Sequence, residues 1–292
     1  MQIEHPIVVI RGGGDLGTGA ALRLQRAGWR VLVCELAQPL VIRRTVAFAS
    51  AVYEGSIEVE GVIAQRIDRV EEAERLWAAE RVPVLIDPDW SKSKALSPAV
   101  IVDAVMAKRN SGTRIDDASI VIGVGPGFTA GVDCHAVVET QRGHNLGRVY
   151  YQGAAAPDTG QPGQIGGEAA SRVIRAPSAG VFYGHRQIGE RVKAGDVIGR
   201  VIALDGAVSD SGAWRVVTAD RDSSRPLGQV IKTKIEGVLR GLLHDGLLIA
   251  AGTKVADVDP RAEESYCFTV SDKALAVGGG VLEAALYVMR HS

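Results

Sequence analysis

The sequence predicts an α/β domain with a parallel sheet, followed by a smaller β-rich domain. Three observations lead to this prediction. Short β-branched runs alternate with helical segments in the first half, which is typical of a parallel sheet covered on both faces. A glycine-rich loop follows the first of these runs. The second half contains an internal repeat with matched glycines, which mark matched turns.

The elements of the first half follow from runs of apolar residues and their boundaries. Strands are expected where short apolar runs occur, and helices where apolar residues recur at helical spacing before a glycine stop. The expected strands are 7–10, 30–35, 82–87, 99–105 and 119–125, and the expected helices are 19–27 and 69–80. We expect the first domain to cover residues 1–155.

The loop "RGGGDLG" lies between the first strand and the first helix and matches G-x-G-x-x-G. Glycines let the backbone approach a pyrophosphate, and the helix start offers N–H groups and a positive dipole. Glu35 ends the second strand, where a Rossmann-like domain holds the ribose hydroxyls. The alternative is a turn that only allows close packing, with Asp15 as the helix cap. The candidate ligand-binding residues are Arg11, Gly12, Gly13, Gly14, Asp15, Gly17 and Glu35.

A second glycine-rich loop, "VIGVGPGFTAG", follows the strand at 119–125. Successive N–H groups there could form an anion nest, so Gly123, Gly125, Gly127 and the nearby His135 join the candidates. His135 and Glu139 can share one face, as an acid/base or metal pair or as a structural ion pair. Because both loops follow parallel strands, we expect them at one edge of the sheet, around a shared cleft for a phosphorylated ligand.

Beyond a linker at 154–167, "GVFYGHRQIGERVKAGDVIGRV" (180–201) aligns without a gap on "GVLRGLLHDGLLIAAGTKVADV" (237–258). The pattern resembles the half-motif of biotinyl/lipoyl barrel-sandwich domains, which implies such a domain over 168–262. Lys232 and Lys234 have no methionine neighbours, so covalent biotin or lipoate is not expected. About thirty residues separate the two copies. Residues 263–292 read as a strand and an amphipathic helix that packs on the first domain.

Composition excludes several classes of function. The formal charge of −1 and an aromatic content of 5% argue against nucleic acid and anionic membranes as partners. Three cysteines without a C-x-x-C spacing fit a reducing compartment and give no zinc-ligand pattern. The N-terminal stretch has no signal-peptide pattern and no apolar run reaches the length of a membrane span, so we expect a cytoplasmic protein.

Taken together, "RGGGDLGTGAALRLQRAGW", "VDAVMAKRN", "VIGVGPGFTAGVDCHAVVETQRGHNLGRV" and "SDKALAVGGGVLEAAL" resemble the YqeB family of accessory proteins for selenium-dependent molybdenum hydroxylases. That family is similar to the XdhC/CoxI maturation factors, which have a Rossmann domain. The resemblance implies maturation or insertion of the molybdenum cofactor, with molybdenum hydroxylases or cofactor-assembly proteins as partners. It carries no established reaction, so no catalytic or metal-binding residue is assigned.

The expected ligand is a nucleotide, either NAD(P) or a cytidine or adenosine nucleotide, or molybdopterin. Two other functions stay open from the sequence. One is an NAD(P)-dependent oxidoreductase, favoured by the first glycine loop and Glu35. The other is a non-catalytic scaffold that docks a molybdoenzyme through its β-rich domain.

Overall fold

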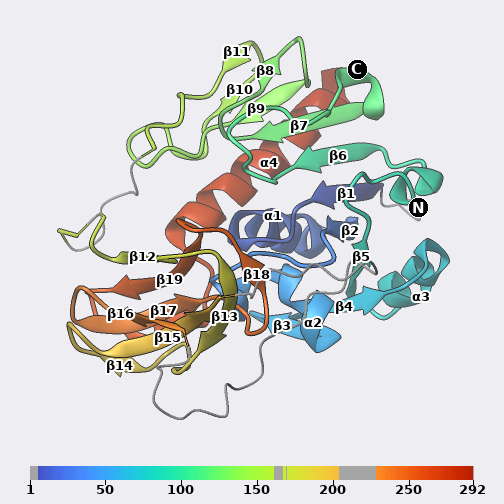
Figure 1. Ribbon diagram of the computed structural model, residues 1–292. Helices are drawn as coiled ribbons and strands as arrows, with labels where there is room; N and C mark the ends of the chain where they lie inside the picture. The colour runs from blue at the N-terminus through green and yellow to red at the C-terminus, as the bar shows by residue number, and fades with distance from the viewer. Residues whose placement is uncertain (1–5, 161–166, 169, 204–227, 292) are drawn as a thin grey trace. The chain divides into compact units, whose positions relative to one another are not determined.

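The computed structural model describes residues 6–160, 167–168, 170–203 and 228–291 (Figure 1). They form two compact units. The first unit comprises Met1–Pro39, Thr45–Gly160 and Phe268–Ser292, and the second comprises Leu40–Arg44 and Gln161–Cys267. Most of the expected linker (161–166) and the stretch between the two repeat copies (204–227) lie outside the described residues.

A mixed sheet of nine strands forms the centre of the first unit, in the order β10-β9-β7-β6-β1-β2-β5-β4-β3. The inner neighbours are parallel, whereas β3 and β10 run antiparallel to β4 and β9 at the two edges. The bounds are β1 (Ile7–Arg11), β2 (Arg30–Glu35), β3 (Ser56–Val59), β4 (Val62–Ile67), β5 (Val82–Ile86), β6 (Val100–Asp103), β7 (Ile120–Val124), β9 (Ala136–Val138) and β10 (Val149–Tyr150).

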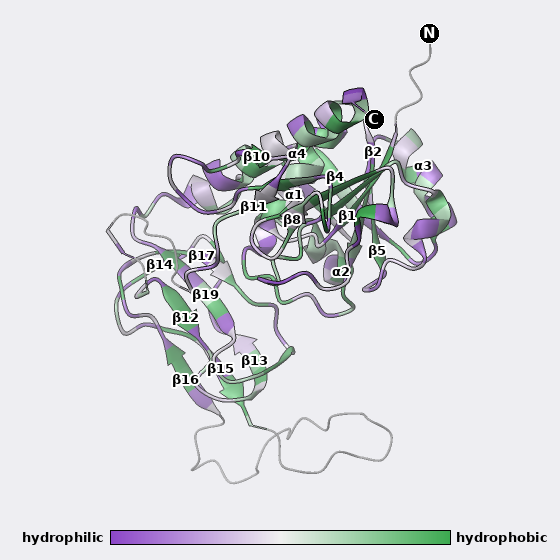
Figure 2. Ribbon diagram, turned by 90° about the horizontal axis from the view of Figure 1, so that it is seen from above, coloured by the Kyte–Doolittle hydropathy of each residue, from purple (hydrophilic) through white to green (hydrophobic). Residues whose placement is uncertain are grey.

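Alternating side chains of these strands fill two cores, one on each face of the sheet. Val8 and Ile10 of β1 join a cluster that includes helix residues such as Leu24 and Val281, whereas Val9 joins the cluster on the other face. The central strands are accordingly mostly hydrophobic (Figure 2). Smaller elements of this unit are α2 (Ala51–Glu54), α3 (Ala73–Ala78), a β8–β11 pair (Thr129–Ala130 and Gly153–Ala154) and 3₁₀ turns at Phe48–Ser50, Val70–Glu72, Ser93–Leu96 and Ile115–Asp117.

Helices α1 (Asp15–Arg26) and α4 (Asp272–His291) lie side by side on the first unit (Figure 1). Gly19 lies against Ala274, and Gly278 lies against Gly19 and Arg23. Residue numbers therefore rise together along the contact, so the helices are parallel and both begin near the carboxyl edge of the sheet. The segment before α4 is a 3₁₀ turn, Glu264–Cys267, where the sequence suggested a strand.

The second unit consists of two four-stranded sheets, ordered β12-β19-β17-β14 and β16-β15-β13-β18. All of their pairings are antiparallel. The bounds are β12 (Val173–Arg175), β13 (Gly180–Gly184), β14 (Arg191–Val192), β15 (Val197–Ile202), β16 (Gln229–Lys232), β17 (Gly237–Leu242), β18 (Leu248–Ile249) and β19 (Lys254–Asp259), and a 3₁₀ turn, Arg44–Val46, begins in this unit.

The two copies of the repeat exchange equivalent hydrogen bonds. The Gly189 N–H donates to the Leu239 carbonyl, and the Gly246 N–H donates to the Phe182 carbonyl at the corresponding positions, at 2.9 and 2.8 Å. Strand pairings follow the same exchange, since β13 pairs with β15 and β18 as β17 pairs with β19 and β14. Each copy thus completes the other, and neither sheet is made from one copy alone.

The fold class predicted from the sequence, a Rossmann-like parallel sheet with a biotinyl/lipoyl-like barrel-sandwich domain, was wrong. The structure has a mixed nine-stranded sheet and separate antiparallel sheets. Alternating strands and helices indicate which strands are buried, but they do not fix the direction of short edge strands. Glycine spacing marks turns and leaves the order of strands in a sheet open.

Among the described residues, none of the helices combines the length and the apolar character that a membrane span requires.

Two neighbouring glycines of α4 test the contact between the helices. A Cβ at Gly278 would strike the Gly19 carbonyl oxygen, whereas one at Gly279 would meet nothing within 4 Å. We expect Gly278→Ala to lower the free energy of unfolding by about 1–3 kcal/mol, as overpacking does. Gly279→Ala should raise it by up to about 1 kcal/mol, because alanine is the better helix former. Urea unfolding of both variants checks this, and equal effects would contradict the close contact.

Candidate functional site

The carboxyl edge of the sheet in the first unit brings the two glycine-rich loops together. Residues 12–14 follow β1 and residues 125–127 follow β7, and both strands run parallel to β6 between them. The predicted place of both loops at one edge of the sheet is confirmed, whereas the shared cleft between them stays a prediction. The order of strands reverses beside β1, with β2 on one side and β6 on the other, so this edge contains a topological switch point, where α/β sheets bind ligands.

The glycines of the first loop differ in how much space a side chain would have. Gly12 has a φ of +95°, and a Cβ there would lie 3.1 Å from the Ala104 backbone across the switch point. Gly13 and Gly17 leave no room for a Cβ, because Ala49 N and the Gly12 carbonyl oxygen lie against them. Gly14 differs, since a Cβ there would meet nothing within 4 Å. Packing therefore explains three of these glycines and leaves Gly14 beside open space.

Gly14 caps the N-terminus of α1 with an ordinary extended backbone, φ −63° and ψ −178°, and gives no side-chain cap. The first N–H groups of a helix have no partner within the helix. An anion at the start of a helix is in general stabilised by these N–H groups and by the helix dipole.

Glu35 lies at the end of β2 and holds the loop from the neighbouring strand. Its Oε2 accepts the Gly13 N–H at 2.7 Å and its Oε1 accepts the Leu36 N–H at 2.8 Å. Burial raises the pKa of Glu35, and these two N–H groups oppose that rise. Structure and sequence thus agree on where Glu35 lies, and its carboxylate fixes the conformation of the loop.

Arg11 is engaged within the protein. Its Nη1 lies 3.0 Å from Oδ2 of buried Asp103 and 3.3 Å from the Thr113 hydroxyl, and its guanidinium lies 5.1 Å from the centre of the Trp90 ring. The charge of Arg11 is therefore balanced by Asp103. Any anion at this edge would depend mainly on main-chain N–H groups and on other cations.

The glycines of the second loop are engaged in packing and in a main-chain hydrogen bond within the protein. A Cβ at Gly123 would strike the Phe128 ring, and one at Gly127 would lie 2.6 Å from Arg109 Cα. The Gly125 N–H donates to Val138 O at 2.9 Å. Glycine is thus required here for close packing, whereas the sequence suggested an anion nest.

His135 and Glu139 do not bond to each other in the described structure. His135 directly precedes β9, and its Nδ1 accepts the Val121 N–H at 3.0 Å. Burial lowers its pKa. Glu139 directly follows the same strand and accepts the Gln141 and Ala156 N–H groups at 2.6 and 2.8 Å. Both side chains support main-chain structure, so the expected acid/base or metal pair is not formed.

Lys273, which the sequence gave no reason to select, lies at the start of α4 near the first loop. Burial lowers its pKa, and the Arg142 charge acts in the same direction. The carboxylates of Asp15, Glu139 and Asp272 oppose this. Asp15 belongs to the first turn of α1, so Lys273 offsets a negative charge that works against an anion there. The two residues are far apart in sequence, and only the packing of α4 on α1 brings them together.

The described residues offer neither a cluster of metal ligands nor an accessible thiol. Within the described residues, no group of three or more His, Cys, Asp or Glu side chains is placed to hold a metal ion. All three cysteines are buried and free of disulfides. Burial raises the pKa of Cys34 to about 12 and that of Cys134 to about 11, and it also raises the pKa of Cys267.

Comparison with known protein families gives no match for this chain. The chain is 47% identical over 286 residues to a curated protein of Escherichia coli (strain K12), the uncharacterized protein YqeB. The alignment covers 98% of this chain and 48% of YqeB, so the chain spans about half the length of that relative. It is a homologue of YqeB, as its motifs indicated.

Similar solved structures include an aspartoacylase family protein from Mesorhizobium loti MAFF303099, with a TM-score of 0.28 and 11% identity over 89% of this chain and 87% of that one. Another is a succinylglutamate desuccinylase/aspartoacylase from Rhodobacter sphaeroides, with a TM-score of 0.26 and 11% identity over 87% and 85% of the two chains. At these scores the likeness assigns no activity to this chain.

These comparisons correct the function expected from the sequence. The solved neighbours are named as desuccinylase and aspartoacylase proteins, and the homologue is named as uncharacterized. A role in maturing the molybdenum cofactor, with its alternatives of an NAD(P)-dependent oxidoreductase and a docking scaffold, is therefore not retained. The expected ligands and protein partners are not tested by these findings and stay predictions.

The buried thiols give a direct test of this arrangement. A thiol with a pKa of about 8.5 is about one quarter thiolate at pH 8, whereas one with a pKa near 12 is thiolate on the order of one part in ten thousand. We expect the folded protein to leave all three cysteines unreacted with a thiol-specific reagent at pH 8. All three should react after unfolding in guanidinium. Rapid reaction of Cys134 in the folded protein would contradict its burial.

Proposed function

We propose that the first unit binds a nucleotide through the loop at residues 12–17, with a phosphate group over Gly14 at the start of α1. The observation that carries this proposal is the open space beside Gly14. Packing requires glycine at the three other glycine positions of the loop, 12, 13 and 17. The switch point beside β1 is the general place for ligands in sheets of this kind. The proposal includes no reaction and no link to molybdenum enzymes.

The charges around the loop at residues 12–17 are more favourable to a bound phosphate than the sequence suggested, because Lys273 lies near the loop. The N-terminus of α1 supplies N–H groups and a dipole that favours a negative charge by roughly 0.3–1 kcal/mol when exposed. Lys273 adds a cation close to Asp15. Several such donors could hold a phosphate with micromolar affinity, which corresponds to about −8 kcal/mol. Glu35, at the end of the adjacent strand, is an acceptor in the position that suits ribose hydroxyls.

The deciding experiment fills the space over Gly14. Its φ and ψ suit any residue and its Cβ direction is open, so Gly14→Val should fold normally and still obstruct a phosphate. We expect at least tenfold weaker binding of NAD, NADP, ATP or CTP, whichever binds the unaltered protein, as measured by calorimetry. Gly279→Val makes the same change at another open glycine and should have no effect.

Circular dichroism and thermal unfolding serve as the folding controls. Failure of all four nucleotides to bind the unaltered protein would overturn the proposal. Equal binding by a folded Gly14→Val variant would show that the loop is only a turn.

Removal of the Lys273 charge tests the electrostatic part of the site. We expect Lys273→Met to weaken nucleotide binding about five- to tenfold at low salt and by less at 0.5 M salt, since salt screens the interaction. Arg26→Met removes a cation from the opposite end of α1, where it pairs with Glu60, and should leave binding unchanged. An equal loss in both variants would point to the overall charge of the protein instead of a local contact.

A further inference from the structure

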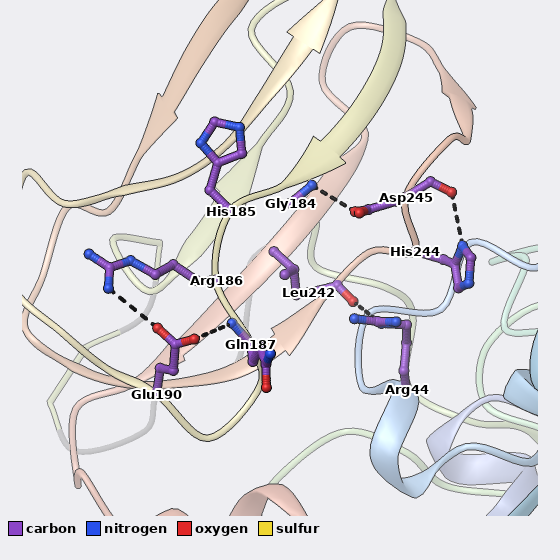
Figure 3. A pocket seen from close by; sticks show the side chains of 9 residues that line it. All are labelled: Arg44, Gly184, His185, Arg186, Gln187, Glu190, Leu242, His244 and Asp245. Atoms are coloured by element: carbon purple, nitrogen blue, oxygen red, sulfur yellow. Dashed lines mark hydrogen bonds and ion pairs between the residues drawn. The ribbon is translucent and has the colours of Figure 1, made fainter.

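A pocket of about 450 Å³ lies in the second unit and is lined by both copies of the repeat (Figure 3). The first copy contributes residues 184–187 and 190, and the second contributes residues 242, 244 and 245. Arg44 completes the lining from the segment Leu40–Arg44, which belongs to the same unit. Cavities of about 300–1,000 Å³ are typical of small-molecule sites.

A comparison of the two copies of the repeat shows which polar residues of this pocket the fold requires. Matched glycines begin and end the corresponding turns of both copies, at 184 and 189 and at 241 and 246. Between and beside them, His185, Arg186 and Glu190 of the first copy correspond to Leu242, Leu243 and Leu247 of the second. Because the second copy forms the same turn with leucines, the fold of the turn does not require these three polar side chains.

The two carboxylates in the lining are already compensated by the pocket wall. Glu190 accepts the Gln187 N–H at 2.8 Å with one oxygen, and its other oxygen lies 3.3 Å from Arg186 Nη1. Asp245 accepts the Gly184 N–H at 2.7 Å. A Cβ at Gly184 would intrude on Leu242 and Asp245, so glycine lets the second copy close onto the first.

Arg44 is positioned for the pocket by main-chain bonds. The Leu242 N–H donates to Ile42 O at 2.8 Å, and Arg44 Nε donates to Leu242 O at 2.8 Å. Arg44 and His244 both line the pocket (Figure 3). His244 Nδ1 lies 2.9 Å from the Asp245 carbonyl oxygen, which can only accept, so Nδ1 carries the hydrogen.

The unit around this pocket is basic although the whole chain is not. Its described residues, 40–44, 167–168, 170–203 and 228–267, hold thirteen lysines and arginines against nine aspartates and glutamates, a net charge of +4. The whole chain has a formal charge of −1. In the lining itself, Arg44 and Arg186 are matched in charge by Glu190 and Asp245, so the excess positive charge lies around the pocket. A guanidinium matches the planar geometry of an oxyanion.

We propose that this pocket binds a small molecule with a carboxylate or phosphate group, held by Arg44 with His244 and Gln187 as neighbouring hydrogen-bonding groups. The site is separate from the nucleotide site proposed in the first unit and does not depend on it. The two copies of the repeat keep the glycines of this turn but differ in its side chains, and residues of both copies line the proposed site.

Calorimetry on the full chain tests the proposal with four probes: succinate, citrate, inorganic phosphate and pyrophosphate, at constant ionic strength set with chloride. We expect at least one probe to bind, and its identity distinguishes a carboxylate from a phosphate ligand. Arg44→Gln should weaken that binding at least tenfold. Lys232→Gln removes an exposed positive charge of the same unit outside the pocket and should change it by less than twofold.

Two further variants make the result decisive. Arg186→Gln alters an exposed pocket residue and should weaken binding about threefold or more, even if Arg44→Gln fails to fold. Gly14→Val should leave unchanged the part of the binding that Arg44→Gln removes, and a loss of that same part in Gly14→Val would move the anion to the first unit and overturn the proposal. Absence of binding by all four probes, or an equal loss in Lys232→Gln, would overturn it as well.

Discussion

The first unit depends on the close approach of α1 to two other stretches of backbone. Gly17 lies against the Gly12 carbonyl, and Gly19 lies against Ala274 of α4. A side chain at either position would separate the helix from the sheet edge or from its partner helix. This contact sets where both helices begin, and therefore which N–H groups and which charges meet at the carboxyl edge of the sheet.

Carboxylates at that edge act chiefly as acceptors for the loops. Glu35 and Glu139 each bind two main-chain N–H groups, and Asp87 binds the Ser93 N–H at 2.9 Å. Asp103 balances Arg11 and accepts the Val105 N–H at 3.1 Å. Buried carboxylates of this kind must be satisfied by hydrogen bonds. Their common role is to hold the loops in place, which leaves the open side of Gly14 as the feature that packing does not explain.

In the second unit the same backbone is built twice with different side chains. Exchange of hydrogen bonds between the copies, as at Gly189 and Gly246, makes the glycines and the apolar positions indispensable in both. The turns between them differ in burial, since Leu242, Leu243 and Leu247 are buried in the second copy whereas the first copy's turn is largely exposed. One copy carries leucines there and the other carries histidine, arginine and glutamate, so the repeat satisfies the fold while its exposed turn is available for recognition.

The sequence by itself determined the local features of this protein. Glycine spacing identified the turn after β1, the place of Glu35 and both copies of the repeat, because these depend on backbone conformation and on neighbours along the chain. Tertiary structure alone decided the directions of the edge strands, the ion pair of Arg11 with Asp103, the separate partners of His135 and Glu139, and the approach of Lys273 to Asp15. These features join residues that are distant in sequence, and their contacts are set by how whole elements pack, which no local pattern records.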